Sequence, residues 1–221
     1  MSNKQIPEPS DINFERTNVI QVYEKIADHF DTTRYKPWPV VEAFLTSLAP
    51  HSLGLDIGCG NGKYFKVAPA VQIIGCDTCE KLLKIAGEKS YFVFLANALT
   101  LPVRDGVVDF CISIAVIHHL STDARRFGCL KEMMRVLRIG GRCLVFVWAW
   151  EQSNPKRKYQ DPDAQVSWVH KQTQVTYFRY YHFFVRGELE ELVKRLGTDK
   201  VKIVKSGYDR DNWYVEFERI L

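Results

Sequence analysis

The sequence predicts an α/β fold built on one mostly parallel sheet. Short β-branched runs alternate with helical patterns, a glycine-rich loop follows the first of these runs, and Asp56 and Asp77 end two successive runs. With 46% hydrophobic and 25% charged positions, the 221 residues have the composition of an ordinary globular domain, which excludes a disordered or collagen-like chain. A domain of this length folds without a disulfide or metal staple.

Five runs are expected to be the first strands of the sheet, and the clearest helix lies between the last two. That helix should begin after Ser121 as N-cap, carry Phe127, Leu130, Met134 and Leu137 on one face, and end at Gly140 and Gly141. The expected strands are 53–57, 71–76, 91–96, 107–114 and 142–148.

The flanking segments suggest two parts. Helices predicted at 17–30 and 39–48 lead us to expect N-terminal helices over residues 1–50 that cap the ligand site of the sheet, and the domain that contains the sheet over 51–221. Within that domain the polar stretch 151–176 is expected to be a long exposed loop. Periodicity returns as a helix at 185–196 and strands at 200–205 and 213–218.

Charge and cysteine usage narrow the class of protein only slightly. Thirty basic and 26 acidic residues give a net charge of +4, which permits a polyanionic partner without requiring one. No apolar run reaches the roughly 20 residues of a membrane span, and the polar start resembles no signal or transit peptide. We therefore expect a protein of the cytoplasm, with the nucleus as a second location. The six cysteines are expected to be reduced, and Cys76 and Cys79 to form a coincidental CxxC without a metal.

The loop after the first predicted strand has the pattern D-x-G-x-G-x-G, with glycines at 58, 60 and 62 and Asn61 between the last two. Such a loop brings bare backbone against a ligand. The carboxylate of Asp56 would repel a pyrophosphate but suits a cation. Asp77, about 20 residues further on, can accept hydrogen bonds from ribose hydroxyls. A tight turn could instead explain the glycines, and a solvated helix cap could explain Asp77. Because both features occur in order and at the spacing of a βαβ unit, these explanations are the weaker ones.

This arrangement resembles the class I S-adenosylmethionine-dependent methyltransferases. Asn97 and Ala98 follow the third strand, where that family often has an acidic residue, so Asn97 departs from the pattern. The resemblance implies a Rossmann-like, seven-stranded, mostly parallel sheet with helices on both faces. It also implies a cofactor site for S-adenosylmethionine formed by Asp56, Gly58, Gly60, Asn61, Gly62, Asp77, Asn97, Ala98 and Ile114.

Four further blocks are similar to the eukaryotic tRNA methyltransferases that esterify 5-carboxymethyluridine at the wobble position of the anticodon. These blocks are Arg34-Tyr35-Lys36-Pro37-Trp38-Pro39, 113–119, Arg179-Tyr180-Tyr181-His182 and Arg210-Asp211-Asn212-Trp213. In that family the product is the methyl ester of carboxymethyluridine or of its 2-thio form. The catalytic subunit there works with a small zinc-binding activator and acts on the tRNA anticodon stem-loop.

The implied chemistry suits these residue types. A carboxylate acceptor is already ionised at neutral pH and needs no general base, so cationic and aromatic groups are more useful than a proton acceptor. Candidate catalytic residues are Arg34, His118, His119 and Arg179. Candidate substrate-binding residues are Tyr35, Lys36, Trp38, Tyr180, Tyr181, His182, Arg210, Asn212 and Trp213. Core packing is the competing explanation for the aromatic residues.

The strand expected at 91–96 is a candidate binding site for a partner protein. In class I methyltransferases the third strand lies at one edge of the sheet, and here residues 90–96 carry neither charge nor proline. Proteins normally cover or pair such an edge. The resemblance implies that the activator pairs with it, and a covering loop of the same chain is the alternative.

Two other functions share these motifs. A methyltransferase acting on a quinone, sterol or metabolite acid would have the same cofactor residues. Only the arginine and aromatic blocks distinguish a tRNA methyltransferase from it. A noncatalytic scaffold would keep the fold and lose the cofactor, which the intact acidic residues and glycines argue against.

Overall fold

The computed structural model describes residues 12–33, 36–153 and 159–221. Its centre is a seven-stranded sheet with strand order β3-β2-β1-β4-β5-β9-β8, in which only β9 and β8 run antiparallel to their neighbours. The expected seven-stranded, mostly parallel architecture is therefore confirmed. The strands are β1 (Leu53–Ile57), β2 (Gln72–Asp77), β3 (Val93–Leu95), β4 (Val108–Ile114), β5 (Leu137–Trp148), β8 (Val201–Asp209) and β9 (Asn212–Arg219).

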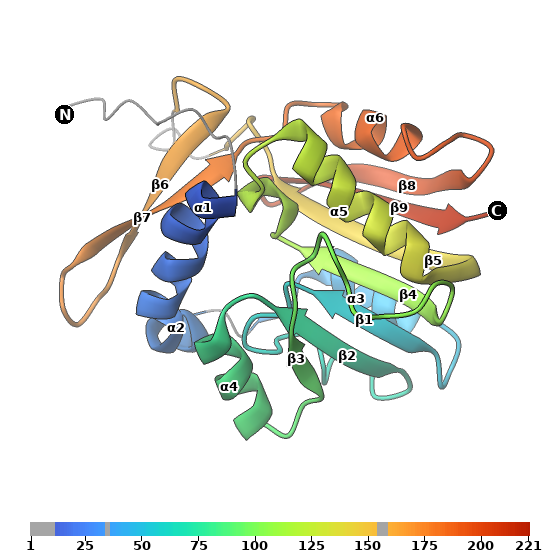
Figure 1. Cartoon of the computed structure of the whole chain (residues 1–221), viewed down its shortest axis with the longest axis horizontal. Coiled ribbons are helices and arrows are strands. Elements are labelled where there is room, and N and C mark those ends of the chain that lie inside the picture. The colour runs from blue at the N-terminus through green and yellow to red at the C-terminus, as the bar shows by residue number, and fades with distance from the viewer. Residues whose placement is uncertain (1–11, 34–35, 154–158) are drawn as a thin grey trace.

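Helices cover both faces of this sheet (Figure 1). On one face, α3 packs its Val41, Phe44 and Leu45 against apolar side chains of β4 and β5. On the other face, α5 and α6 pack against a second cluster from the same strands. The helical elements are α1 (Ile12–Glu15), the π-helix η1 (Arg16–Ile20), α2 (Gln21–Thr33), α3 (Pro39–Thr46), α4 (Glu80–Glu88), the 3-10 turn η2 (Ile117–His119), α5 (Asp123–Val136) and α6 (Glu188–Lys194).

The segment expected to be a loop at 151–176 contains a strand, and that expectation is wrong. Strand β6 (Asp163–Val169) pairs antiparallel with β7 (Thr176–His182) in a separate two-stranded sheet, which projects beside α2 in Figure 1. The alternation of buried Val166 and Trp168 with exposed neighbours is the strand signal, weak because it covers only two apolar positions. The β6–β7 hairpin forms one wall of the site described below.

Two helix boundaries differ from expectation. The N-cap of α5 is Thr122, whose hydroxyl accepts a hydrogen bond from the Arg125 amide at 3.3 Å. The helix ends at Val136, and Gly140 and Gly141 do not end it. They lie in a bulge of β5 where the pairing with β4 shifts register, and Gly140 takes a φ of +78°.

Acidic side chains bind the continuous helical segment α1–η1–α2 to the rest of the domain. Glu15, which is buried, accepts hydrogen bonds from the amide and hydroxyl of Ser121 and forms a bidentate ion pair with Arg125 at 2.6 and 2.7 Å. Asp31, at the other end, accepts hydrogen bonds from Lys89 and from the Asn61 side chain. These contacts hold α2 over the carboxyl ends of β1, β2 and β4.

Within the described ranges, no helix is long and apolar enough to cross a membrane.

Candidate active site

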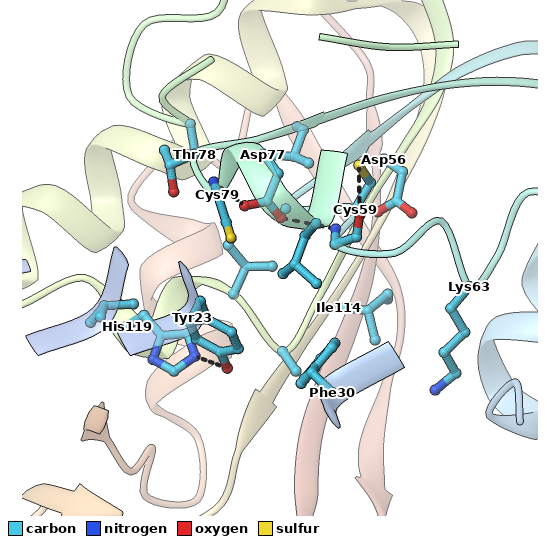
Figure 2. Close-up of a pocket in the computed structure, with 18 of the residues that line it drawn as sticks. Tyr23, Phe30, Asp56, Cys59, Lys63, Asp77, Thr78, Cys79, Ile114 and His119 are labelled. Carbon is cyan, nitrogen blue, oxygen red and sulfur yellow. Dashed lines mark hydrogen bonds between the residues drawn. The ribbon is translucent and has the colours of Figure 1, made fainter. Parts of the chain in front are cut away.

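A cavity of about 610 Å³ opens at the carboxyl ends of β1, β2 and β4 and is roofed by α2. Open α/β sheets place their ligands at this edge. Figure 2 shows Asp56, Cys59 and Asp77 on one side of it and Tyr23 and His119 on another. The predicted residues that line it are Lys36, Trp38, Asp56, Gly58, Gly60, Asn61, Asp77, Asn97, Ala98, Ile114, His119, Arg179, Tyr181, Arg210 and Asn212.

The glycine loop follows β1 directly and continues as turns through residue 67 instead of starting a regular helix. Gly58, Gly60 and Gly62 all have positive φ values, which glycine adopts at little cost. A Cβ at Gly60 would meet only ordinary contacts, with Phe30 at 3.8 Å, so the loop presents bare backbone to the cavity there. The Gly60 amide donates to Oδ2 of Asp77 at 2.9 Å, which fixes the loop against the end of β2.

Two buried carboxylates give this end of the cavity its electrostatic character. Asp56 is only 1% exposed, and its Oδ2 has no hydrogen-bond partner among the described residues. Burial and the nearby charge of Asp77 raise the pKa of Asp56 to about 8, against the opposing effect of Lys63. Burial also raises the pKa of Asp77. A cationic ligand would relieve this cost by favouring the ionised form of Asp56.

The adenine side of the expected cofactor site is formed after β3. Asn97 accepts a hydrogen bond from the Leu99 amide through Oδ1 at 2.9 Å, a local turn that orients its side chain. Asn97 and Ala98 line the cavity together with apolar Leu82 of α4. The residues present therefore fit S-adenosylmethionine: an acid for its cationic methionine end, Asp77 beside the glycine loop, and an amide and apolar surface for its base.

The opposite end of the cavity centres on Arg179 of β7. Its side chain is 3% exposed, and its guanidinium carbon lies 5.5, 4.9 and 5.2 Å from the ring centroids of Tyr23, Trp168 and Tyr181. Its Nη1 donates to the Tyr23 hydroxyl at 3.1 Å. No carboxylate of the described residues forms a salt bridge with it, and its buried Nε has no hydrogen-bond partner among them, which leaves the cation able to pair with an anion from outside the protein.

His119 lies next to this cation in its neutral form. Burial lowers the pKa of His119 to about 3. Its Nδ1 lies 2.8 Å from the carbonyl oxygen of Tyr180, which can only accept, so Nδ1 carries the proton. Nε2 therefore accepts a hydrogen bond from the Tyr23 hydroxyl at 3.0 Å. Arg179 thus donates to the Tyr23 hydroxyl, and that hydroxyl donates to His119.

Five predicted site residues lie away from the cavity. Gly62 faces the ring of Tyr91, and the hydroxyl of Tyr180 is buried against Asp163 and the Ser121 carbonyl. His182 lies between Asp163 and Glu188 at 2.9 and 2.7 Å, and Trp213 donates to Glu151 at 2.9 Å.

The fifth of these residues, His118, is fully buried. It accepts the Trp148 amide hydrogen at Nδ1 and stacks on Tyr181 with 4.6 Å between ring centroids, so it lies behind side chains that line the cavity. Arg34 and Tyr35 lie outside the described residues.

Sequence reasoning missed several residues of this cavity, and Tyr23 is the most important. Tyr23 and Phe30 share one face of the predicted helix at 17–30, a signal consistent with simple packing. Lys63, which follows the glycine loop directly, also lines the cavity, as do Glu15 and Trp148. Among the described residues, no group of three or more His, Cys, Asp or Glu side chains is placed to hold a metal ion.

Residues 55–145 match the family model for a methyltransferase domain. The fold is similar to that of the DhpI–SAM–HEP complex, with a TM-score of 0.69, 15% identity and coverage of 91% of this chain and 96% of that one. A chain in the complex between the Haloferax volcanii Trm112 methyltransferase activator and a methyltransferase gives a TM-score of 0.65 at 12% identity, covering 91% and 98%. The protein is a class I S-adenosylmethionine-dependent methyltransferase.

A tRNA (carboxymethyluridine(34)-5-O)-methyltransferase of Schizosaccharomyces pombe is 46% identical over 95% of this chain and 99% of its own length. The chain therefore belongs to the tRNA (carboxymethyluridine(34)-5-O)-methyltransferase family. The relative of the same name from Xenopus tropicalis, alkbh8, is 36% identical over 93% of this chain. This chain spans only 41% of that longer relative.

Proposed function

We propose that this chain methylates the carboxylate of 5-carboxymethyluridine, or of its 2-thio form, at the wobble position of tRNA. The observation that carries the proposal is the buried guanidinium of Arg179, which has three aromatic rings around it and no salt bridge to a described carboxylate. A substrate carboxylate would supply the missing negative charge. The tRNA methyltransferases at 46% and 36% identity support the same substrate.

The site is suited to alignment of the acceptor and not to proton removal. A carboxylic acid with an ordinary pKa near 4 is ionised at neutral pH, so its oxygen is already nucleophilic. S-adenosylmethionine, when bound, supplies a methyl group on a positively charged sulfur. Arg179, oriented by the Tyr23 hydroxyl, holds one end of the acceptor, and aromatic side chains around it exclude water from the reacting atoms.

The opposite end of the cavity would hold the cofactor. Asp56 and Asp77 end β1 and β2, and the bare loop at Gly60 lies between them. Lys36, Trp38 and Arg210 also line the cavity, and we assign them to the tRNA. A cation and a ring of these types bind phosphate and an unstacked base.

The direct test incubates the protein with S-adenosylmethionine labelled in its methyl group and tRNA that carries 5-carboxymethyluridine. Label that mild alkali releases indicates an ester, whereas base or ribose methylation resists that treatment. Arg179→Lys should lower kcat/KM by about a hundredfold, because a point charge does not replace a planar fork held between rings. Arg195→Lys, on an exposed pair with Asp123, is the matched control and should be near wild type. Alkali-stable product, or full activity of Arg179→Lys, would overturn the proposal.

We propose that a small methyltransferase activator pairs with the edge of the sheet at β3. Phe92 and Leu95 are 80% and 56% exposed there, which is unusual for large apolar side chains on a sheet edge. The likeness in fold to a chain from a Trm112 activator complex supports this partner. The expected mode is addition of a strand, with Phe92 and Leu95 covered.

Coexpression tests this partner. The lone chain should be poorly soluble, and a coexpressed activator should rescue it and copurify with it. Phe92→Lys should reduce copurification, whereas Ile139→Lys, at a position 64% exposed elsewhere on the molecule, should not. A soluble, fully active lone chain would count against the partner and would leave the proposed reaction intact.

A further inference from the structure

A second hollow, of about 540 Å³, lies beside the active-site cavity between the carboxyl-terminal turn of α2 and the β6–β7 hairpin. His29 and Thr33 of α2 line one side, and Ser167, Trp168 and Val169 of β6 line the other. Lys171, in the turn between β6 and β7, is exposed at its rim. The reaction proposed above uses none of these side chains except the Trp168 ring beside Arg179.

The hollow and the cavity share a wall. Thr33 lines both of them. The guanidinium carbon of Arg179 lies 4.9 Å from the ring centroid of Trp168. On its other side, the indole Nε1 of Trp168 donates a hydrogen bond to Nδ1 of His29 at 3.0 Å. A single aromatic side chain therefore separates the hollow from the group that would hold the substrate carboxylate.

The chemistry of the hollow fits a nucleotide. Its described lining has one lysine, one histidine, hydroxyl groups, an indole and a half-exposed valine, and it includes no carboxylate. An ammonium group at the rim suits a phosphate, and hydroxyl groups suit ribose or phosphate oxygens. Val169 and the indole edge offer an apolar surface to a base. The β6–β7 hairpin that forms this wall stands apart from the central sheet (Figure 1).

We infer that this hollow is a subsite for the nucleotide that adjoins the methylated uridine in the anticodon loop, with Lys171 at its phosphate. The inference rests on the proposed function, because it takes the uridine itself to occupy the cavity. Only unpaired RNA can place one base in the cavity and turn its neighbour past Trp168 into the hollow. The subsite would therefore select unpaired RNA whatever its sequence.

The test uses an anticodon stem-loop RNA that carries 5-carboxymethyluridine, and the protein with its activator. Lys171→Glu should lower kcat/KM on this RNA by about tenfold, because it replaces a phosphate contact by a repulsion. Lys200→Glu makes the same change of net charge in the exposed turn before β8 and should have a much smaller effect. The dissociation constant for S-adenosylmethionine should be equal in both variants and in the wild type.

A second series locates the contact. Stem-loops with an uncharged methylphosphonate linkage immediately 5′ or 3′ of the wobble nucleotide should each be measured with wild type and Lys171→Glu. At one of the two positions the losses should fail to add, which marks a shared interaction. Equal behaviour of Lys171→Glu and Lys200→Glu, or additive losses at both positions, would overturn the subsite. Failure of the wild type to methylate any of these RNAs would instead overturn the proposed function.

Discussion

The hydroxyl of Tyr23 lies 3.0 Å from Nε2 of His119, and Nη1 of Arg179 donates to the same hydroxyl at 3.1 Å. Because Nδ1 of His119 is committed to the Tyr180 carbonyl, the direction of every hydrogen bond in this chain is fixed. Tyr23 of α2 thus sets the orientation of the Arg179 guanidinium, which comes from β7.

Tyr23→Phe should weaken acceptor binding and leave cofactor binding intact. The variant keeps the ring against Arg179 and removes only the hydroxyl, so the hydrogen bond from Nη1 of Arg179 to that hydroxyl is lost. We expect kcat/KM for tRNA to fall about tenfold with an unchanged dissociation constant for S-adenosylmethionine. Steady-state kinetics and calorimetry measure the two quantities. Equal losses in both would show that the hydroxyl supports the whole cavity.

Asp56→Asn should reduce the pH dependence of stability. The pKa of Asp56 is raised to about 8, mainly by burial, from an unfolded value near 4. Between these values the folded chain holds a proton that the unfolded chain does not, so the free energy of unfolding falls as pH rises through this window. The variant should lower that slope by about 1.4 kcal/mol per pH unit, as urea denaturation from pH 5 to 8 would show. An unchanged slope would mean that Asp56 is ionised in the folded protein.

Cofactor binding should release a proton from the wild type near neutral pH. A cation beside Asp56 favours the carboxylate over the protonated form that burial favours. Calorimetric titration with S-adenosylmethionine in two buffers of different ionisation enthalpy measures this release. Asp56→Asn should show less release and about tenfold weaker binding, and identical enthalpies in both buffers for the wild type would contradict the idea.

Gly60→Ala and Gly62→Ala should separate cofactor affinity from stability. Both positions have positive φ, so both variants bear a similar backbone cost of about 1 kcal/mol. A Cβ at Gly60 projects toward the cavity, whereas one at Gly62 would lie 2.4 Å from the ring of Tyr91. Gly60→Ala should therefore mainly weaken S-adenosylmethionine binding, and Gly62→Ala should mainly lower the unfolding free energy, by about 3 kcal/mol. The reverse order would refute this division.

Glu15→Gln should destabilise the protein by about 3 kcal/mol. The substitution weakens a buried bidentate ion pair with Arg125 and the contacts to Ser121, leaving a partly buried cation uncompensated. Glu191→Gln, in the exposed pair with Lys194, should leave the free energy of unfolding almost unchanged and is the control. Denaturant unfolding of both variants gives the comparison, which similar losses would contradict.

The parts of the fold that local patterns determine could be predicted from the sequence. β1 was expected at 53–57 and found at Leu53–Ile57, because a buried parallel strand followed by a glycine loop leaves a signal within a few residues. β6 was missed because its outward side chains, apart from Val169, are polar. Its inward ones, Val166 and Trp168, are buried by β7 and the residues after it and by segments far away in the sequence such as α2.

The same distinction applies to the site. Asp56 and Asp77 could be recognised because each ends a strand beside the glycine loop, and both line the cavity. Tyr23 could not, because its hydrogen-bond partners lie 96 and 156 residues away along the chain. His118 and His119 are neighbours in sequence, yet the turn η2 sends only His119 into the cavity.

All six cysteines are free and buried, and burial raises the pKa of every one of the six thiols. Alkylating reagents attack the thiolate, so the native molecule should label slowly and each modified sulfur should record an opening event. Three of these thiols, on Cys59, Cys76 and Cys79, border the cavity, while the others lie in the core between α5 and the sheet. Mass spectrometry after brief labelling would thus distinguish a loosened cofactor pocket from a loosened core without any engineered cysteine.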